Sequence, residues 1–232
     1  MKAQLKMHNG TPTVFLNDQP AFFGCHLVGY MDPNNLDENQ HIARKYAEAG
    51  VHIYSIDTLN VEWCGPHAGD PSHYDFSIVV PRMQSYIDVD PHATFLLRMC
   101  FETRWTPGNW WNQTYPDEVE VLSDGVRYTQ SFASEVWKAQ VHDFLRAYIE
   151  YLKSVGMYDR VMGFQVDAGS SGEWIKDMSC MMQPTMDYSA PMQRHFQSWL
   201  RERYGDDAAL QKAWVNPTIT LDSGASRLAP GK

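Results

Sequence analysis

The feature that most constrains the fold is a short apolar segment followed by a helix-forming segment, a unit that occurs four times along the 232-residue chain. Near-continuous apolar strands that alternate with helices predict a parallel sheet covered by helices. The predicted strands are residues 21–28, 51–57, 93–101 and 161–167. The predicted helices are residues 34–49, 76–87 with a possible interruption at Pro81, 131–155 and 192–204, with a short one that Asp206 caps and that runs to Trp214.

The connections between these segments are of two kinds. The loops that follow the strands are long and rich in polar and aromatic residues, whereas Gly50 leads directly into Val51. This asymmetry is typical of a (β/α)8 barrel, whose site lies at the C-terminal ends of its strands. No GxGxxG motif follows the first strand, which argues against a dinucleotide-binding Rossmann fold. The sequence therefore predicts an α/β fold, namely a partial TIM barrel of about four βα units.

A β-hairpin is expected before the barrel, within residues 4–23, because Asn9-Gly10 lies between two strand-like runs. We expect residues 1–222 to form a single half-barrel domain and residues 223–232 to be a tail or linker. The apolar runs 95–97 and 161–164 occupy both odd and even positions, so both faces of the sheet should be buried. We therefore expect a homodimer or higher homo-oligomer that closes or covers the sheet.

The charge and the chain's N-terminus exclude several classes of partner. The net charge of −9 argues against nucleic acid and anionic membranes. No apolar run approaches the ~20 residues of a membrane span, and the N-terminus lacks an apolar signal core. We expect a cytoplasmic protein whose widely spaced cysteines are free thiols: Cys25, Cys64, Cys100 and Cys180.

The richest stretch in chemical terms is residues 160–174, where the fourth strand leads into a loop of small residues. This loop carries Asp167 and Glu173, with Trp174 beside the second carboxylate. A carboxylate next to an aromatic side chain, just past a strand, is typical of an active site in a parallel α/β protein. The alternative is a glycine- and serine-rich loop with solvated acids and one packed tryptophan.

Other polar residues lie at the ends of the predicted strands. Asp57 and Glu102 would accept hydrogen bonds from sugar hydroxyls, or serve as helix caps or surface acids. Arg98 lies within an apolar strand and needs an anionic partner, for which Glu102 and Asp57 are the candidates. His26 would hydrogen-bond a sugar or pack as a core residue.

Several tryptophans lie in polar, loop-like contexts, where they offer flat apolar faces of the kind that stack on sugar rings. Those assigned to substrate binding are Trp105, Trp110, Trp111 and Trp174. The spacing of Cys64, His67 and His73 near Glu62 is only weak evidence for a metal. We expect no metal and no cofactor.

Taken together, several motifs resemble the barrel of family-42 β-galactosidase-like glycoside hydrolases. They are NGTPTVFLN (9–17), YDFS (74–77), FLLR (95–98), WW (110–111), YPDE (115–118), GFQVDAG (163–169), GEW (172–174) and WLRERYG (199–205). The resemblance covers roughly residues 9–222 and implies the N-terminal half of a retaining TIM-barrel glycosidase. It implies a general acid/base Glu after the fourth strand, often preceded by Asn, and a nucleophilic Glu after the seventh. Glu173 is the first candidate for the acid/base, and because Gly172 rather than Asn precedes it, Asp167 is its rival.

Two functions follow from these expectations. The first is a glycoside hydrolase acting on β-linked sugars, active as an oligomer that completes the barrel. Retaining hydrolysis needs two carboxyls about 5 Å apart, and the four predicted strands end before the position of the family's nucleophile. The second is a non-catalytic carbohydrate-binding or structural half-barrel.

Overall fold

The computed structural model describes residues 1–28, 36–58, 62–65, 74–169, 174 and 187–226. Contacts divide the chain into two compact units. The first contains Met1–Phe101 and Phe144–Trp174, and the second contains Glu102–Asp143 and Ile175–Lys232. The single half-barrel domain over residues 1–222 stays a prediction, and the two units are described separately below.

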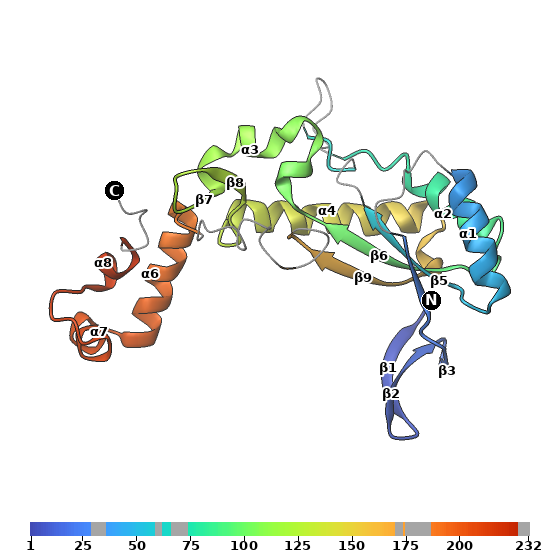
Figure 1. The fold of residues 1–232 in the computed structure, drawn as a ribbon, viewed down its shortest axis with the longest axis horizontal. Helices are drawn as coiled ribbons and strands as arrows, with labels where there is room; N and C mark the ends of the chain where they lie inside the picture. The colour runs from blue at the N-terminus through green and yellow to red at the C-terminus, as the bar shows by residue number, and fades with distance from the viewer. Residues whose placement is uncertain (29–35, 59–61, 66–73, 170–173, 175–186, 227–232) are drawn as a thin grey trace. The chain divides into compact units, whose positions relative to one another are not determined.

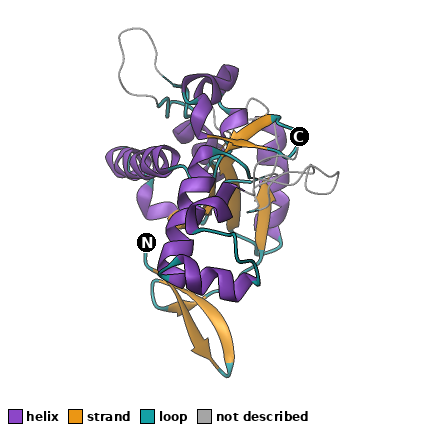
Figure 2. Ribbon diagram, turned by 90° about the vertical axis from the view of Figure 1, so that its left-hand side faces the viewer, coloured by secondary structure: helices purple, strands orange, loops and turns teal. Residues whose placement is uncertain are grey.

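The first unit begins with the predicted hairpin. Strands β1 (Ala3–His8) and β2 (Thr11–Leu16) pair antiparallel, and β3 (Gln19–Pro20) pairs with β2; Figure 2 shows β1 and β2 as the long pair of strands beside the N-terminus. Asn9 and Gly10 form the turn with φ values of 51° and 79°. Two successive positive φ values are what a tight two-residue hairpin turn requires, and asparagine and glycine tolerate them best.

Four parallel strands organise the rest of the first unit (Figure 1). They are β4 (Cys25–Val28), β5 (Ile53–Thr58), β6 (Thr94–Cys100) and β9 (Val161–Asp167). Each is hydrogen-bonded to the next in the order β4-β5-β6-β9, and all three pairs are parallel. The order in the sheet follows the order in the chain, as in a TIM barrel. The predicted strands and the partial-barrel fold are confirmed.

The helices that separate these strands also match the prediction. They are α1 (Leu36–Glu48), α2 (Val79–Ile87) and α4 (Glu135–Ser154), with a short 3-10 turn, η4 (Tyr158–Arg160), before β9. Pro81 does not interrupt α2, because it lies in the first turn, where a helical N–H has no partner within the helix. The helix begins at Val79, three residues after the predicted start at Phe76.

Side chains alternate between the two faces of the sheet, and the two faces differ in chemistry. Tyr54, Phe95 and Leu97 are fully buried on the face that meets the helices. The Tyr54 hydroxyl, for example, donates a hydrogen bond to the Ala43 carbonyl oxygen of α1 at 3.2 Å. Asp57 pairs in register with Arg98, and each lies an odd number of residues from Tyr54 or Phe95, so both lie on the opposite face.

Aromatic side chains fill the space between the end of β6 and the second half of α4. The Phe101 ring lies 5.3 Å from the Phe144 ring, and the Phe144 ring lies 5.8 Å from the Tyr148 ring, measured between centroids. Phe76 packs edge-on against both rings of α4. Aromatic pairs at these separations add to the stabilisation from area burial alone.

The second unit contains short elements and a helical group. These are η1 (Thr103–Trp105), η2 (Pro107–Asn109), α3 (Trp110–Thr114), η3 (Pro116–Glu118), β7 (Val119–Val121), β8 (Arg127–Gln130), α6 (Ala190–Tyr204), α7 (Asp207–Trp214) and α8 (Leu221–Ser226). Asp206 caps α7 as predicted, its carboxylate accepting the Ala209 N–H at 2.8 Å. Helix α8 occupies the first residues of the expected tail. Among the described residues, no helix combines the length and apolarity that a membrane crossing requires.

Candidate active site

The C-terminal ends of β5, β6 and β9 bring together three of the predicted site residues. The strand register places Asp57 opposite Arg98, and it places Cys100 opposite Asp167. The Arg98 Nη1 atom lies 2.9 Å from the Asp57 Oδ1 atom. Of the two partners that the sequence allowed for Arg98, the structure pairs it with Asp57.

Burial dominates the electrostatics of Asp57. Loss of solvent raises the pKa of its carboxyl, and the positive charges of Arg98 and Arg82 partly offset that effect. The Asp57 side chain is 17% exposed and that of Arg98 is 10% exposed. Because water screens these two charges poorly, their attraction is stronger than that of a surface ion pair and depends on their close contact.

Burial also changes the protonation of Asp167. It is 1% exposed, and burial raises its pKa from the ordinary value of 3.8 to about 6. The Cys100 thiol and the Arg98 charge act in the opposite direction, and the Asp57 charge adds to the rise. Within the described residues, neither carboxylate oxygen of Asp167 has a hydrogen-bond partner of sound geometry. A carboxyl with these properties keeps its proton up to about pH 6, well above the ordinary range of an aspartate, as a general acid requires.

Trp174 lies beside the end of β9. Its indole N–H donates to the Val166 carbonyl oxygen at 2.9 Å, and the residue is 57% exposed. The hydrogen bond fixes the ring next to the strand that carries Asp167, and leaves much of its surface in solvent. Glu173, the first candidate for the acid/base, lies outside the described residues.

His26 faces away from this cluster. Its ring stacks on Tyr46 of α1 with 4.2 Å between centroids, and it pairs in register with Tyr54 on the helix-facing side of the sheet. Burial lowers the pKa of its imidazole, which favours the neutral form. This environment matches the second reading of His26, a core residue.

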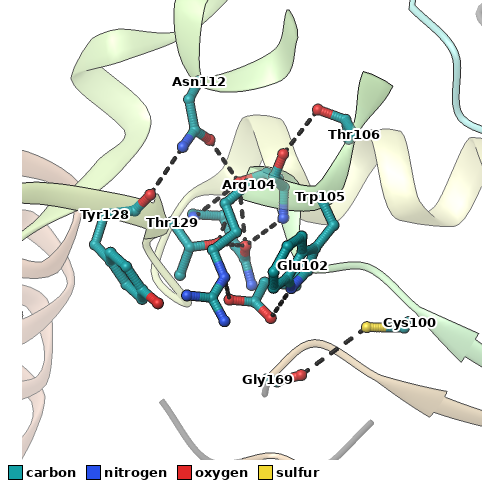
Figure 3. Close-up of polar contacts among 11 residues, drawn as sticks. Cys100, Glu102, Arg104, Trp105, Thr106, Asn112, Tyr128, Thr129 and Gly169 are labelled. Atoms are coloured by element: carbon teal, nitrogen blue, oxygen red, sulfur yellow. Dashed lines mark hydrogen bonds and ion pairs between the residues drawn. The ribbon is translucent and has the colours of Figure 1, made fainter. Parts of the chain in front are cut away.

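Glu102 belongs to the second unit, where it anchors a compact cluster (Figure 3). Its buried carboxylate lies 2.6 Å from the Arg104 Nε atom and accepts the Trp105 indole N–H at 3.0 Å. The Arg104 guanidinium lies between two rings, 4.5 Å from the centre of Trp105 and 4.6 Å from that of Tyr128. Glu102 thus holds an arginine–aromatic stack in which Trp105 remains 60% exposed.

The remaining tryptophans of the second unit differ in exposure. Trp111 is fully buried and donates its indole N–H to Gln140 Oε1 at 2.6 Å, so it presents no ring face to solvent. Trp110 is partly buried at the start of α3. Of the three, Trp105 therefore has the exposed face that sugar stacking needs.

Sequence reasoning missed two residues that bear on the strand-end cluster. Arg82 of α2 donates to the Asp57 carbonyl oxygen at 3.0 Å and contacts Glu62, whose side chain is fully buried. The signal was present, because Arg82 lies among the buried positions of α2 with Val79, Met83 and Tyr86. A charged residue on the apolar stripe of a helix indicates a buried ionic partner.

The cysteines and possible metal ligands complete the inventory. Cys25, Cys64 and Cys100 are free thiols, and Cys180 lies outside the described residues. The described part of the chain holds no group of three or more side chains arranged to bind a metal ion. His67 and His73, from the weak metal pattern, are not among the described residues.

Solved structures with a similar fold include beta-galactosidases and the catalytic domain of a beta-amylase. The chain superposes on beta-galactosidase from the psychrophilic Marinomonas ef1 with a TM-score of 0.58 at 17% identity, covering 86% of this chain and 28% of that one. On beta-galactosidase from Bacillus circulans sp. alkalophilus it superposes with a TM-score of 0.53 at 19% identity, covering 86% of this chain and 27% of that one. On the catalytic domain of beta-amylase from Paenibacillus polymyxa it superposes with a TM-score of 0.59 at 12% identity, covering 85% of this chain and 51% of that one. The chain thus spans little more than a quarter of the two beta-galactosidases and about half of the beta-amylase domain.

The sequence itself identifies the family. No curated protein matches the chain. The model of glycoside hydrolase family 42, described as beta-galactosidase, matches residues 31–218, which is most of the chain and includes all of β5, β6 and β9. The chain therefore belongs to glycoside hydrolase family 42, the beta-galactosidase family.

Proposed function

We propose that this chain supplies the acid/base part of a site that hydrolyses β-linked galactosides. The observation that carries the proposal is Asp167, a buried carboxyl at the C-terminal end of β9 whose pKa is raised to about 6. It stands beside the Arg98–Asp57 ion pair on the face of the sheet opposite the helices. Family membership and the similarity to beta-galactosidases support the choice of substrate class.

In this proposal the protonated carboxyl donates its proton to the glycosidic oxygen as the bond to the leaving group breaks. Asp167 is the described residue whose protonation suits this step, and Glu173 six residues later is its rival. The Asp57–Arg98 pair orients polar groups around the sugar, and the exposed ring of Trp174 stacks on it.

A second carboxyl must stabilise the positive charge that develops at the anomeric carbon. The family resemblance assigns it to a Glu after the seventh strand of the barrel, whereas the described sheet has four strands. We propose that a homo-oligomer, in which a further copy of the chain completes the barrel, supplies the second carboxyl from the strand ends of that copy in place of the family's own Glu. Light scattering gives the mass in solution, and a monomer at micromolar concentration would refute this part of the proposal.

The activity is tested with a panel of 4-nitrophenyl β-glycosides. The wild-type chain should release nitrophenol fastest from the β-galactoside. Glu173→Gln and Asp167→Asn then separate the two candidates in the cleavage of lactose, whose sugar leaving group needs a proton to depart, because the variant of the true acid should lose about 100-fold or more in rate. Equal rates in all three proteins would show that neither carboxyl acts as the acid.

The second candidate function is a non-catalytic carbohydrate-binding half-barrel. It is favoured by the rings of Trp105 and Trp174, which are 60% and 57% exposed and offer flat apolar faces to a sugar. This function predicts that lactose perturbs the amide spectrum of the chain while no glycoside in the panel is cleaved. Cleavage of the β-galactoside would exclude it.

A further inference from the structure

Helix α2 carries a buried arginine that bonds directly to the backbone of the strand-end cluster. The Arg82 Nη1 atom donates to the Asp57 carbonyl oxygen at 3.0 Å and to Glu62 Oε1 at 3.4 Å. The Arg82 side chain is 7% exposed and that of Glu62 is not exposed at all. One nitrogen therefore joins the end of β5, the loop that follows it, and α2.

The contact lies at the C-terminal end of β5, beside the predicted site residues. Toward β6 the register runs through the pair Asp57–Arg98. Arg82 thus bonds to the backbone of the residue whose carboxylate pairs with Arg98.

Stability alone does not account for a charged pair at this place. A buried ion pair adds little net stability relative to apolar side chains of the same size, and its neighbours here, Tyr86 and Tyr148, are fully buried aromatic residues. Both of these rings lie close enough for the Arg82 charge to act on their hydroxyls. An apolar filler would suit these surroundings, whereas only a donor can bond to the Asp57 carbonyl.

We propose that the Arg82–Glu62 pair is a buried brace that positions Asp57 and, through it, the Arg98 guanidinium beside Asp167. Arg82 is a positioning residue in this account, and its benefit to catalysis rests on the proposed function. The brace also acts through charge, since Arg82 lowers the pKa of the Asp57 carboxyl against the effect of burial. The Asp57 charge in turn raises the pKa of Asp167.

The test is a titration of the two carboxyls by carbon-detected NMR, in a form that does not need activity. The main variant is Glu62→Gln/Arg82→Met, which removes both charges together and avoids leaving one of them buried alone. The pKa of Asp57 should rise, because the Arg82 charge is gone, and that of Asp167 should fall, because Asp57 is ionised over a narrower pH range. Arg82→Lys retains the charge without the fork of donors, so a smaller shift in the same directions would come from the loosened position of Asp57 rather than from a lost charge.

Arg160→Lys is the matched control. The Arg160 Nη1 atom also donates to a backbone carbonyl, that of Pro91 at 2.7 Å, but before the N-terminal end of β6. The Arg160→Lys variant should leave the pKa values of Asp57 and Asp167 as they are in the wild type. If the wild-type chain cleaves β-galactosides, the double variant should lose about 100-fold in kcat with little change in KM, as expected for misplaced groups.

The possible results distinguish this inference from the proposed function. Shifted titrations in a chain without hydrolase activity would support the brace and refute the proposed function. Titrations of Asp57 and Asp167 that stay at their wild-type values in Arg82→Lys, and in the double variant where it folds, would overturn the brace. A loss of stability with unshifted titrations would show that Arg82 has a structural role alone.

Discussion

Replacing Asp167 with asparagine should make the protein more stable at high pH and no more stable at low pH. The folded protein holds the Asp167 proton more tightly than the unfolded chain does, because burial raises its pKa from 3.8 to about 6. The free energy of unfolding therefore falls as the pH rises from about 4 to about 6, and stays lower above that range. Each pKa unit corresponds to about 1.4 kcal/mol, so the penalty at pH 8 is up to about 3 kcal/mol. Asparagine has nearly the same shape and no charge, and removes this penalty.

The measurement is urea denaturation of wild type and Asp167→Asn at several pH values, followed by tryptophan fluorescence. The difference in unfolding free energy should be near zero at pH 4 and should grow to about 2–3 kcal/mol in favour of the variant by pH 8. Asp143→Asn removes the same charge from an exposed position and controls for the change in net charge. A difference that stays constant from pH 4 to pH 8, or a variant that is less stable at pH 8, would refute the reasoning.

Three further substitutions test local features of the fold. Arg98→Met leaves the carboxylate of Asp57 without the cation that lies 2.9 Å away, and should lower the unfolding free energy at pH 7 by about 3 kcal/mol; a loss below about 1 kcal/mol would contradict the ion pair. Asp206→Ala removes the carboxylate that accepts the Ala209 N–H, and should cost about 1 kcal/mol in thermal denaturation, an effect that Asp206→Asn should largely avoid. Gly10→Ala places a Cβ at a φ of 79° and should destabilise the hairpin by about 1 kcal/mol, read from faster amide exchange in β1 and β2; unchanged exchange would count against the turn assignment.

The repeated pattern was enough to predict the sheet, but not every boundary. The four predicted strands are present and parallel, because near-continuous apolar runs between helices have few other ways to be buried. The first strand was predicted from residue 21 but begins at Cys25, and Phe22 and Phe23 before it are 79% and 49% exposed. Apolar character alone does not make a strand, since pairing with a neighbour decides where it begins.

The hairpin of β7 and β8 was missed although the sequence contains its signal. Asp124-Gly125 lies between the two strands, and Gly125 has a φ of 85°. Asp-Gly between strand-like runs is among the strongest hairpin signals. The strand signal itself is weak, because Val119–Val121 is only three residues long.

Periodicity predicts which residues end a strand, but not the face of the sheet on which each of them lies. Placement at a strand end was correct for Asp57 and Asp167, but the face on which each residue lies depends on register. His26 differs from Leu27 by one position, and that step places it against Tyr46 rather than on the face of Asp57. Leu27 lies on the other face of the sheet and is 58% exposed in the single chain, so the burial of both faces stays a prediction.

The role of Arg82 required coordinates, because its contact with the Asp57 carbonyl joins groups 25 residues apart. A charged position on the apolar stripe of α2 indicates that some anionic or carbonyl partner exists, and only the packing of α2 against the end of β5 identifies it.

The most direct test of Asp167 as the general acid is the pH dependence of kcat/KM for lactose between pH 4 and pH 8, because its sugar leaving group, unlike 4-nitrophenol, needs a proton to depart. If Asp167 donates the proton, the rate should fall as the pH rises above about 6, where its carboxyl loses that proton. Asp167→Asn should then be slower by about 100-fold or more at pH 5. A wild-type rate that rises through pH 6, or an Asp167→Asn protein that keeps the wild-type rate at pH 5, would contradict the assignment of Asp167 as the acid.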